Sequence, residues 1–344
     1  MVRRVSLLAC FSLLCVLACG EGPRQRHFRF TYAFTVRNPD QGKPLRVWFP
    51  MAASDHWQQV EVVSATGDLR LRRTRESEYG DRMFYAYTPK ADKPEYRFEV
   101  VYDVLRSERI GLRDGKPVGD AGRLKGPKLN RYLEPDALVP VTGRPAEIAV
   151  EQTHGGETAL EKARQIYDYV FRTMRYDKSG TGWGRGDAMW ACDAHRGNCT
   201  DFHSLFAAMA RSQKIPVRFA IGFAVPDKHE GGIPGYHCWA DFFAENVWIP
   251  VDISEAWQNP SKKEYFFGAH DENRVQFSVG RDIELSPSQS GKRLNYSVYP
   301  YVESGGKKYE NVSNVFSFVD VPAGQNKKPQ KVEQQNRRSV TGNW

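Results

Sequence analysis

The chain has 344 residues, of which 40% are hydrophobic and 26% charged, and its formal net charge is +8. The length predicts two or three domains, and the composition excludes a wholly disordered chain. Basic and acidic residues alternate, as in the segment 70–81, so the sequence lacks the dense basic patch that is typical of nucleic-acid binding. We therefore expect no nucleic-acid partner.

The N-terminus has the pattern of an export signal. Two arginines precede an almost wholly apolar run over 7–17, which is too short to span a membrane but suits a signal peptide. The run ends in VLACG, which resembles the lipobox of bacterial lipoproteins, with Cys19 as the lipidated cysteine. The resemblance implies a signal peptide over 1–18 and an exported protein anchored to the envelope membrane through lipid on Cys19. Gly20 then favours the periplasmic side of the outer membrane in a bacterium with two membranes.

After a polar tether over 19–28, apolar and polar residues alternate as in strands with one buried face. This pattern predicts an N-terminal all-β, sandwich-like domain over 29–112. A stretch rich in Gly, Pro and Lys then opens a connecting segment that extends to residue 150. Later alternating runs predict a C-terminal β-extension over 266–322, and the polar residues 323–344 predict a disordered tail.

The central residues 151–265 combine helical and strand patterns. Thr158 and Glu161 fit a capping box, and apolar residues follow at helical spacing. A second helix is predicted from about Cys199 and ends before Ile215. Predicted strands then cover 217–225, 236–243 and 247–253.

Three cysteines follow Cys19, namely Cys192, Cys199 and Cys238, so at least one thiol is free unless chains pair. A Cys192–Cys238 disulfide would leave Cys199 free, but the sequence does not establish it. Cys199 lies at the start of a predicted helix, where unpaired N–H groups and the helix dipole stabilise a thiolate. Cys199 is therefore a candidate nucleophile.

His237 and Asp252 lie on consecutive predicted strands. A two-residue turn at 244 and 245 would place them directly opposite each other, on one face, with Cβ atoms about 4.5–5.5 Å apart. The carboxylate would then orient the imidazole, and the imidazole would deprotonate Cys199. Spacing alone does not show that the helix packs against this hairpin. From the sequence we expect alanine at any of the three positions to leave folding intact, with the Asp252 change mildest for activity.

Three segments resemble the motifs of the transglutaminase-like superfamily and occur in that family's order: Gly197-Asn-Cys199-Thr-Asp201, Gly235-Tyr-His237-Cys-Trp239 and Trp248-Ile-Pro-Val-Asp252. The resemblance covers roughly residues 155–260, and the segment 271–282 also resembles bacterial members. It implies an α+β, papain-like core, in which a helix bearing Cys199 packs on an antiparallel sheet bearing His237 and Asp252. It also implies a cysteine peptidase, amidase or transglutaminase that acts on protein or peptide substrates through a thioester, with no cofactor.

Several points stay open. The Cys199 N–H is a natural oxyanion donor, and the second could be Trp183, Trp190 or a side-chain amide. Asp201 is expected to support the first helical turn or, with lower weight, to orient the adjacent loop. Neither the choice between hydrolysis and transamidation nor the oligomeric state follows from the sequence.

Two other interpretations compete with the enzyme. Zinc binding is conceivable because thiol and imidazole ligands are available, but it gives Asp252 no role and lacks a Cys-x-x-Cys pair. The candidate ligands would be Cys192, His195, Cys199, His203, His237 and Cys238. The second alternative is a catalytically silent, transglutaminase-like lipoprotein with a binding or structural role in the envelope.

Overall fold

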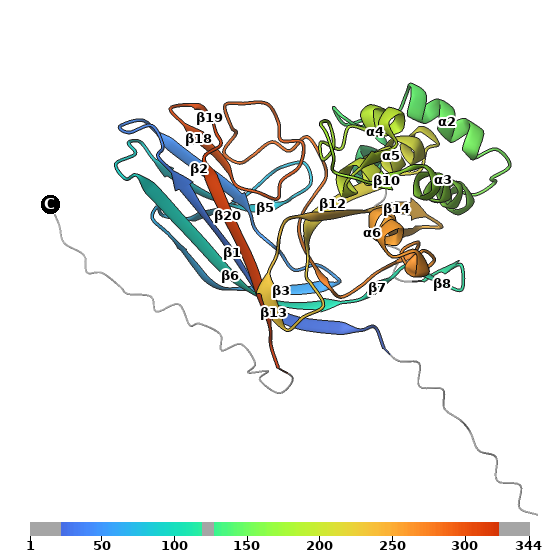
Figure 1. Cartoon of the computed structure of the whole chain (residues 1–344), viewed down its shortest axis with the longest axis horizontal. Coiled ribbons are helices and arrows are strands. Elements are labelled where there is room, and N and C mark those ends of the chain that lie inside the picture. The colour runs from blue at the N-terminus through green and yellow to red at the C-terminus, as the bar shows by residue number, and fades with distance from the viewer. Residues whose placement is uncertain (1–21, 119–126, 323–344) are drawn as a thin grey trace, which may run out of the picture.

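The computed structural model describes residues 22–118 and 127–322, which form two lobes (Figure 1). One lobe is a β-sandwich, and the other carries most of the helices and a smaller sheet. The predicted signal peptide with Cys19 and the predicted tail over 323–344 lie outside the described residues. Within the described ranges, no helix combines the length and the apolar character needed to cross a membrane.

Two antiparallel sheets form the sandwich. The first has the strand order β13-β20-β1-β6-β3, with β1 (Gln25–Arg37), β3 (Gln58–Gly67), β6 (Glu95–Ser107), β13 (Glu230–Gly232) and β20 (Val312–Asp320). The second has the order β19-β18-β2-β5-β4, with β2 (Leu45–Pro50), β4 (Arg72–Arg75), β5 (Arg82–Thr88), β18 (Tyr301–Ser304) and β19 (Lys307–Tyr309).

The alternation along β1 explains why this segment forms a sandwich strand. Its even-numbered positions point into the core, where Phe34 stacks on Phe98 with ring centroids 4.8 Å apart. Pairing with β6 begins at Gln25↔Ser107, so the strand starts inside the segment that the sequence suggests as a tether. The buried aromatic face drives the pairing, and the exposed start of the strand has no apolar pattern that would reveal it.

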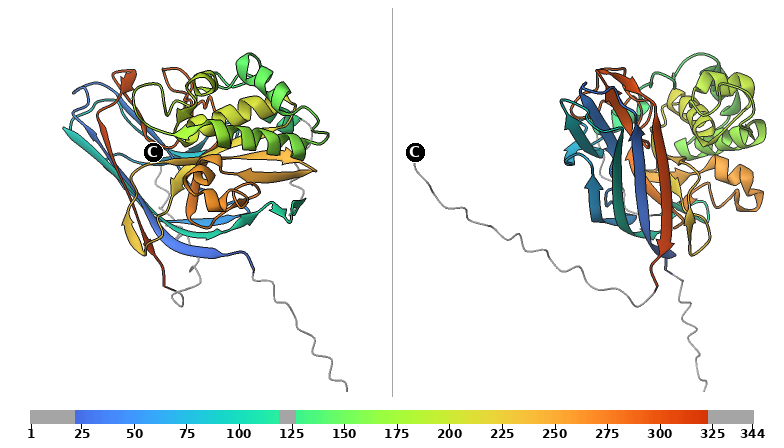
Figure 2. Two further views of the ribbon diagram at one scale, coloured as in Figure 1. Left: turned by 45° about the vertical axis from the view of Figure 1, so that its right-hand side comes forward. Right: turned by 60° about the vertical axis from the view of Figure 1, so that its left-hand side comes forward.

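The C-terminal strands complete the sandwich. β20 pairs with β1 from Phe28↔Asp320 to Val36↔Val312, and β18 pairs with β2. Figure 2 shows this arrangement, with the red C-terminal strand beside the blue N-terminal strand. The segments that the sequence separates as an N-terminal domain and a C-terminal extension therefore form one structural unit. Alternation along a strand identifies its buried face but not its partner.

The second lobe packs helices on a four-stranded antiparallel sheet. The sheet has the order β15-β14-β12-β17, with β12 (Val217–Ala224), β14 (His237–Ala244), β15 (Val247–Val251) and β17 (Arg274–Val279). Its main helices are α2 (Arg144–Gln152), α3 (Ala159–Thr173), α4 (Ala188–Ala194), α5 (Cys199–Ser212) and α6 (Ile253–Gln258). The predicted capping box at the start of α3 is confirmed, since Thr158 and Glu161 each accept the other's backbone N–H.

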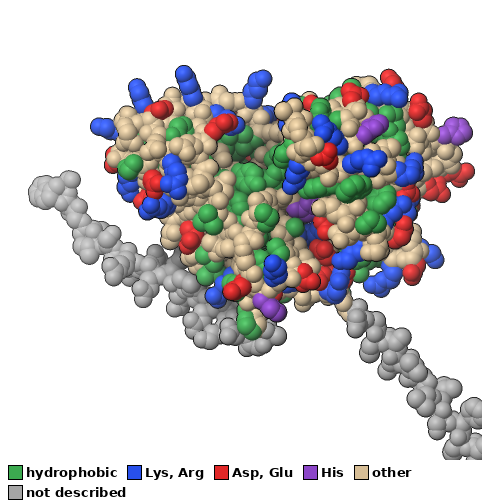
Figure 3. Space-filling model, viewed as in Figure 1, with side chains coloured by type: hydrophobic (Ala, Val, Ile, Leu, Met, Phe, Trp, Pro, Cys, Tyr) green, Lys and Arg blue, Asp and Glu red, His purple; other side chains and the backbone are tan. Residues whose placement is uncertain are grey.

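Short elements connect these layers. They are β7 (Arg109–Ile110), β8 (Leu112–Arg113), β9 (Lys116–Pro117), α1 (Pro127–Asn130), η1 (Arg131–Leu133), β10 (Arg175–Tyr176), β11 (Arg196–Gly197), η2 (Pro260–Lys262) and β16 (Ala269–His270). The lobes also share a core, because Phe30 of the sandwich contacts Phe223 of β12 at a centroid distance of 5.1 Å. Figure 3 shows Lys and Arg interleaved with Asp and Glu over one face of both lobes.

Candidate active site

Cys199 is the first residue of α5 and is only 1% exposed. Asn198 caps this helix, and its side-chain oxygen accepts the Thr200 N–H at 3.0 Å. Gly197 has φ of 147°, a conformation that favours glycine, and a Cβ there would collide with the Asp201 side chain. The sequence Gly-Asn-Cys therefore places a buried thiol at the N-terminal end of a helix.

Asp201 fixes this arrangement from the first turn of the helix. Its carboxylate accepts N–H groups from Asn198 at 2.9 Å, Gly184 at 2.7 Å and Gly186 at 3.0 Å. The predicted support of the first turn is thus present, and the same carboxylate also holds the 184–186 loop. Both roles considered from the sequence are filled by one side chain.

The β14–β15 hairpin differs in register from the sequence prediction. Glu245 and Asn246 both have positive φ, 49° and 63°, and form a two-residue turn of the primed type. The predicted turn at 244 and 245 is therefore wrong by one residue, and the pairing shifts by two, with Phe243 opposite Trp248. Because side chains alternate with a period of two, this shift leaves the predicted face unchanged.

His237 and Asp252 consequently meet, although they are not directly paired in the ladder. His237 Nε2 lies 2.7 Å from Asp252 Oδ2. Asp252 also caps α6, since its Oδ1 accepts the Glu255 N–H at 3.0 Å and the Ser254 hydroxyl at 3.1 Å. The carboxylate is fully buried and held at both oxygens, so it can fix the orientation of the imidazole.

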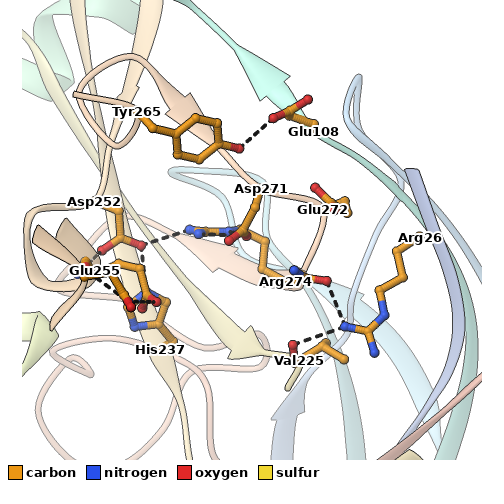
Figure 4. A network of polar contacts seen from close by, with 12 residues as sticks. Arg26, Glu108, Val225, His237, Asp252, Glu255, Tyr265, Asp271, Glu272 and Arg274 are labelled. Carbon is orange, nitrogen blue, oxygen red and sulfur yellow. Dashed lines mark hydrogen bonds and ion pairs between the residues drawn. The ribbon is translucent and has the colours of Figure 1, made fainter. Parts of the chain in front are cut away.

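Arg274, the first residue of β17, is a further partner of this carboxylate. Its Nη1 donates to Asp252 Oδ2 at 3.0 Å, and its Nε donates to Asp271 at 3.0 Å (Figure 4). The guanidinium is 2% exposed and stacks over Trp239 at 4.9 Å. No role was assigned to Arg274 from the sequence, although an arginine before the alternating apolar residues of a predicted strand was an available signal.

His203 joins the helix to the Asp252 turn. Its Nδ1–H donates to the Cys199 carbonyl at 2.8 Å, and its Nε2 accepts the Ile253 N–H at 3.1 Å. This pair of bonds selects one neutral tautomer, and burial lowers the pKa of His203 accordingly. Sequence spacing could not show that α5 packs against the hairpin that precedes Asp252. His203, one turn along α5, makes this contact.

The remaining sulfur and imidazole groups do not assemble around a metal. Cys192, Cys199 and Cys238 are buried free thiols, so the Cys192–Cys238 disulfide is not formed. Across residues 22–118 and 127–322, no three His, Cys, Asp or Glu side chains are placed to hold a metal ion. Cys192 and His195 belong to α4 and its C-terminal end.

Comparison with known proteins agrees with this geometry. Residues 146–253 match the sequence profile of the transglutaminase-like superfamily, and the match contains Cys199, His237 and Asp252. These residues form a transglutaminase-like domain.

Two proteins are similar along most of the chain. An uncharacterized protein of Haemophilus influenzae is 27% identical over 319 residues, which cover 81% of this chain and 85% of that protein. The crystal structure of a candidate cysteine protease from Cytophaga hutchinsonii has a TM-score of 0.59 and 14% identity. It covers 87% of this chain and 92% of its own, so the shared fold includes both lobes. The predicted α+β class and transglutaminase-like core are confirmed.

The pKa values in the transglutaminase-like domain favour a charged pair. Burial acts to raise the pKa of the Cys199 thiol, but interactions with Cys238 and His237 outweigh it and lower that pKa well below its usual value. Burial acts to lower the pKa of His237, but Asp252 and Cys199 outweigh it and raise that pKa. The two directions together favour a thiolate beside an imidazolium.

The surroundings of Cys199 narrow the choice of oxyanion donors. The Cys199 N–H has no hydrogen-bond partner among the described residues and points from the start of the helix. Trp183 Nε1 donates to the Gly180 carbonyl at 3.1 Å, so it is already engaged. The Tyr236 hydroxyl, which the sequence did not single out, accepts from Asn198 Nδ2 at 2.9 Å and stabilises the cap beside the thiol.

Proposed function

We propose that the transglutaminase-like domain is a thiol-dependent acyl-transfer enzyme that acts on peptide bonds or glutamine-type amides. The observation that carries the proposal is the convergence of Cys199, His237 and Asp252 at the start of α5. The thiolate form of Cys199 is favoured by the N-terminal end of α5 and by the His237 imidazole. The buried Asp252 carboxylate supports that imidazole in its charged form.

In the first step the Cys199 thiolate attacks the carbonyl carbon of the amide and forms a C–S bond. The negative charge moves to the carbonyl oxygen, where the Cys199 N–H is placed to donate. The C–N bond then breaks as the His237 imidazolium gives its proton to the leaving amine. The product is a thioester and a neutral imidazole held by Asp252.

In the second step an acceptor attacks the thioester while His237 takes its proton. Water gives a carboxylic acid and restores the thiol, whereas a primary amine gives a new amide. Hydrolysis is the favoured outcome in this proposal, because water is always available as an acceptor. No step requires a metal or an organic cofactor.

The test compares wild type with Cys199→Ala, using Cys192→Ala as a matched removal of a buried thiol outside the site. The protein is incubated with a peptide mixture and with a glutamine peptide plus a primary amine, and products are identified by mass spectrometry. Loss of all product formation in Cys199→Ala but not in Cys192→Ala supports the enzyme. Full turnover in Cys199→Ala contradicts it.

The competing proposal is a silent envelope protein that binds a partner through the same fold. It predicts that Cys199 reacts with iodoacetamide no faster than an ordinary thiol and that no amide is consumed. The buried ion-paired site favours the enzyme, because a carboxylate such as Asp252 is costly to keep buried without a use for its geometry.

We also propose that the protein is exported and anchored by lipid on Cys19, on the strength of the lipobox resemblance alone. Mass spectrometry of the N-terminal peptide from a bacterial host tests this. A lipid-modified peptide that begins at Cys19, with two or three acyl chains, supports the proposal, and an intact N-terminus or cleavage elsewhere contradicts it.

A further inference from the structure

A cavity of about 940 Å³ lies between the sandwich and the four-stranded sheet. Arg218 and Trp248 of that sheet line it, together with Arg106 of β6 and Trp57 beside β3. Arg218 points away from the helices, because the preceding Val217 packs into the helical core and strand side chains alternate. The cavity is therefore on the sheet face opposite α5, and Cys199, His237 and Asp252 are not among the residues that line it.

Arginines dominate the lining of this cavity. Three acidic residues also line it: Asp55, Glu78 and Asp81. The arginines are Arg75, Arg82, Arg106, Arg109, Arg131 and Arg218. The wall therefore carries an excess of positive charge over the acidic groups that face it.

Arg106 is the least satisfied buried guanidinium in the described chain. It is 2% exposed and makes one long hydrogen bond, 3.4 Å from Nη1 to the Gln58 side chain. Its Nε has no partner, and it forms no ion pair with any described residue. By contrast, the other buried arginines, Arg109, Arg211, Arg274 and Arg281, each have an ion pair or several short hydrogen bonds.

Unpartnered donors gather around this cavity. Arg106 Nε, Arg109 Nε, Arg131 Nη1 and Trp248 Nε1 are all buried without a hydrogen-bond partner, and all four residues line the cavity. No fully buried acceptor without a partner, among the described residues, belongs to the lining. Guanidinium and indole N–H groups only donate, so the group that matches them is rich in acceptors.

Neighbouring acids do not neutralise this excess. Asp241, behind the wall, is shared by Arg109 at 2.6 Å and Arg218 at 2.7 Å. Glu78 pairs with Arg131, and burial raises the pKa of Asp81 well above its usual value, which favours its neutral form. Asp55, which lines the same cavity, is the acid that most raises the pKa of Arg106, but it forms no ion pair with that guanidinium.

Aromatic rings hold several of the guanidinium groups in place. Arg218 lies over Trp248 at 4.8 Å, and Arg109 lies over Trp57 at 5.6 Å. Such stacking fixes the guanidinium plane and its donors while leaving apolar ring surface in the wall. The cavity thus offers a charged, donor-rich part and an apolar part.

We propose that this cavity binds the carboxylate or phosphate group of a small organic anion, with Arg106 as its principal ligand. The oxyanion accepts from the Arg106 guanidinium, which lines the cavity and makes only one long hydrogen bond within the protein, and the aromatic walls contact the organic portion of the ligand. Cys199 takes no part in this binding, and the site is distinct from the proposed acyl-transfer function.

The first experiment is calorimetric titration of the purified protein with citrate, phenyl phosphate and inorganic phosphate at constant ionic strength, with chloride as the reference. We expect saturable binding that Arg106→Met weakens by about tenfold to a hundredfold, the range for one lost charge-assisted contact. Arg72→Met changes an exposed arginine outside the cavity and should bind as wild type does. Citrate or phenyl phosphate binding alone identifies the preferred oxyanion.

A second measurement needs no substitution in the buried wall. Phenylglyoxal modification of the exposed lining residues Arg75 and Arg82, followed by mass spectrometry, should slow when the bound anion is present. The proposal is overturned if no tested anion binds saturably, if Arg106→Met binds as tightly as wild type, or if the two exposed arginines gain no protection. Alkylation of Cys199 should be unchanged in Arg106→Met, which separates this outcome from a failure of the active site.

Discussion

The molecule contains two buried clusters of charged side chains that are organised in opposite ways. Around Cys199, each charge has a partner: His237 meets Asp252, and Asp252 meets Arg274. In the cavity between the lobes, Arg106 has no carboxylate partner, and donors outnumber acceptors. Arg106 and Asp252 are both almost fully buried, so the free-energy cost of each charge depends on the partner that it finds in the protein or in a ligand.

The difference indicates that buried charged side chains serve two purposes in this protein. The paired cluster is preorganised for chemistry, because its carboxylate, imidazole and thiol are held in place before any substrate arrives. The unpaired cluster is better satisfied by an anion than by the protein alone. Substitutions should therefore have opposite effects on folding in the two places.

The largest effect is expected from Asp252→Ala. The sequence led us to expect normal folding for this variant, but the structure places Asp252 in a buried ion pair and at the cap of α6. Removing it takes away one of the two carboxylate partners of Arg274 and the carboxylate partner of His237, so the free energy of unfolding should fall by about 3–5 kcal/mol. Urea denaturation measures this, with the exposed Asp193→Ala as the control, and a loss below about 1 kcal/mol would contradict the buried pair.

The direct comparison of the clusters is Arg274→Met against Arg106→Met. Arg274→Met should destabilise the protein by about 3 kcal/mol because it removes the guanidinium that pairs with the buried Asp252 and the partly buried Asp271. Arg106→Met should leave stability in chloride buffer unchanged or slightly higher, since it removes a buried charge without a protein partner. Urea denaturation measures the free energy of unfolding of both variants. An equal decrease in the two would contradict the distinction between a paired and an unpaired cluster.

His237→Ala should change the pH dependence of Cys199 alkylation. In wild type the lowered thiol pKa keeps the thiolate present at neutral pH, and the rate should fall only as acid protonates it. Without His237 the thiol pKa should rise toward about 8.5, which slows reaction at pH 6 by about a hundredfold. Iodoacetamide labelling with peptide mass spectrometry measures the profile, and His154→Ala, in an exposed loop, is the control. An unshifted profile would remove His237 from the proposed mechanism.

The smallest effect is expected from Asn198→Ala, which removes the cap of α5. Thr158→Ala removes the equivalent cap of α3, away from the site. Each should cost about 1 kcal/mol of stability by thermal unfolding. Only Asn198→Ala should also slow alkylation of Cys199, and equal reactivity in both variants would show that the cap does not tune the thiol.

Much of the site was visible in the sequence because its signals are local. Gly197, Asn198 and Asp201 mark the start of a helix within five residues of the chain. Two strands with a short connection indicate a hairpin, so the relation of His237 to Asp252 depended on few assumptions. Even the error in the turn preserved the face, since a shift of two residues keeps the alternation.

The sequence by itself determined which side chains could react and which faces of the strands are buried. Only the tertiary structure decided which strands pair, so it alone joined β20 to β1 and built one sandwich from both ends of the described chain. It alone also brought Arg274 to Asp252, His203 to the Asp252 turn and the arginines of β6 and β12 to one cavity. These contacts join residues far apart in the chain, and periodicity fixes the direction of a side chain but not the partner that it meets.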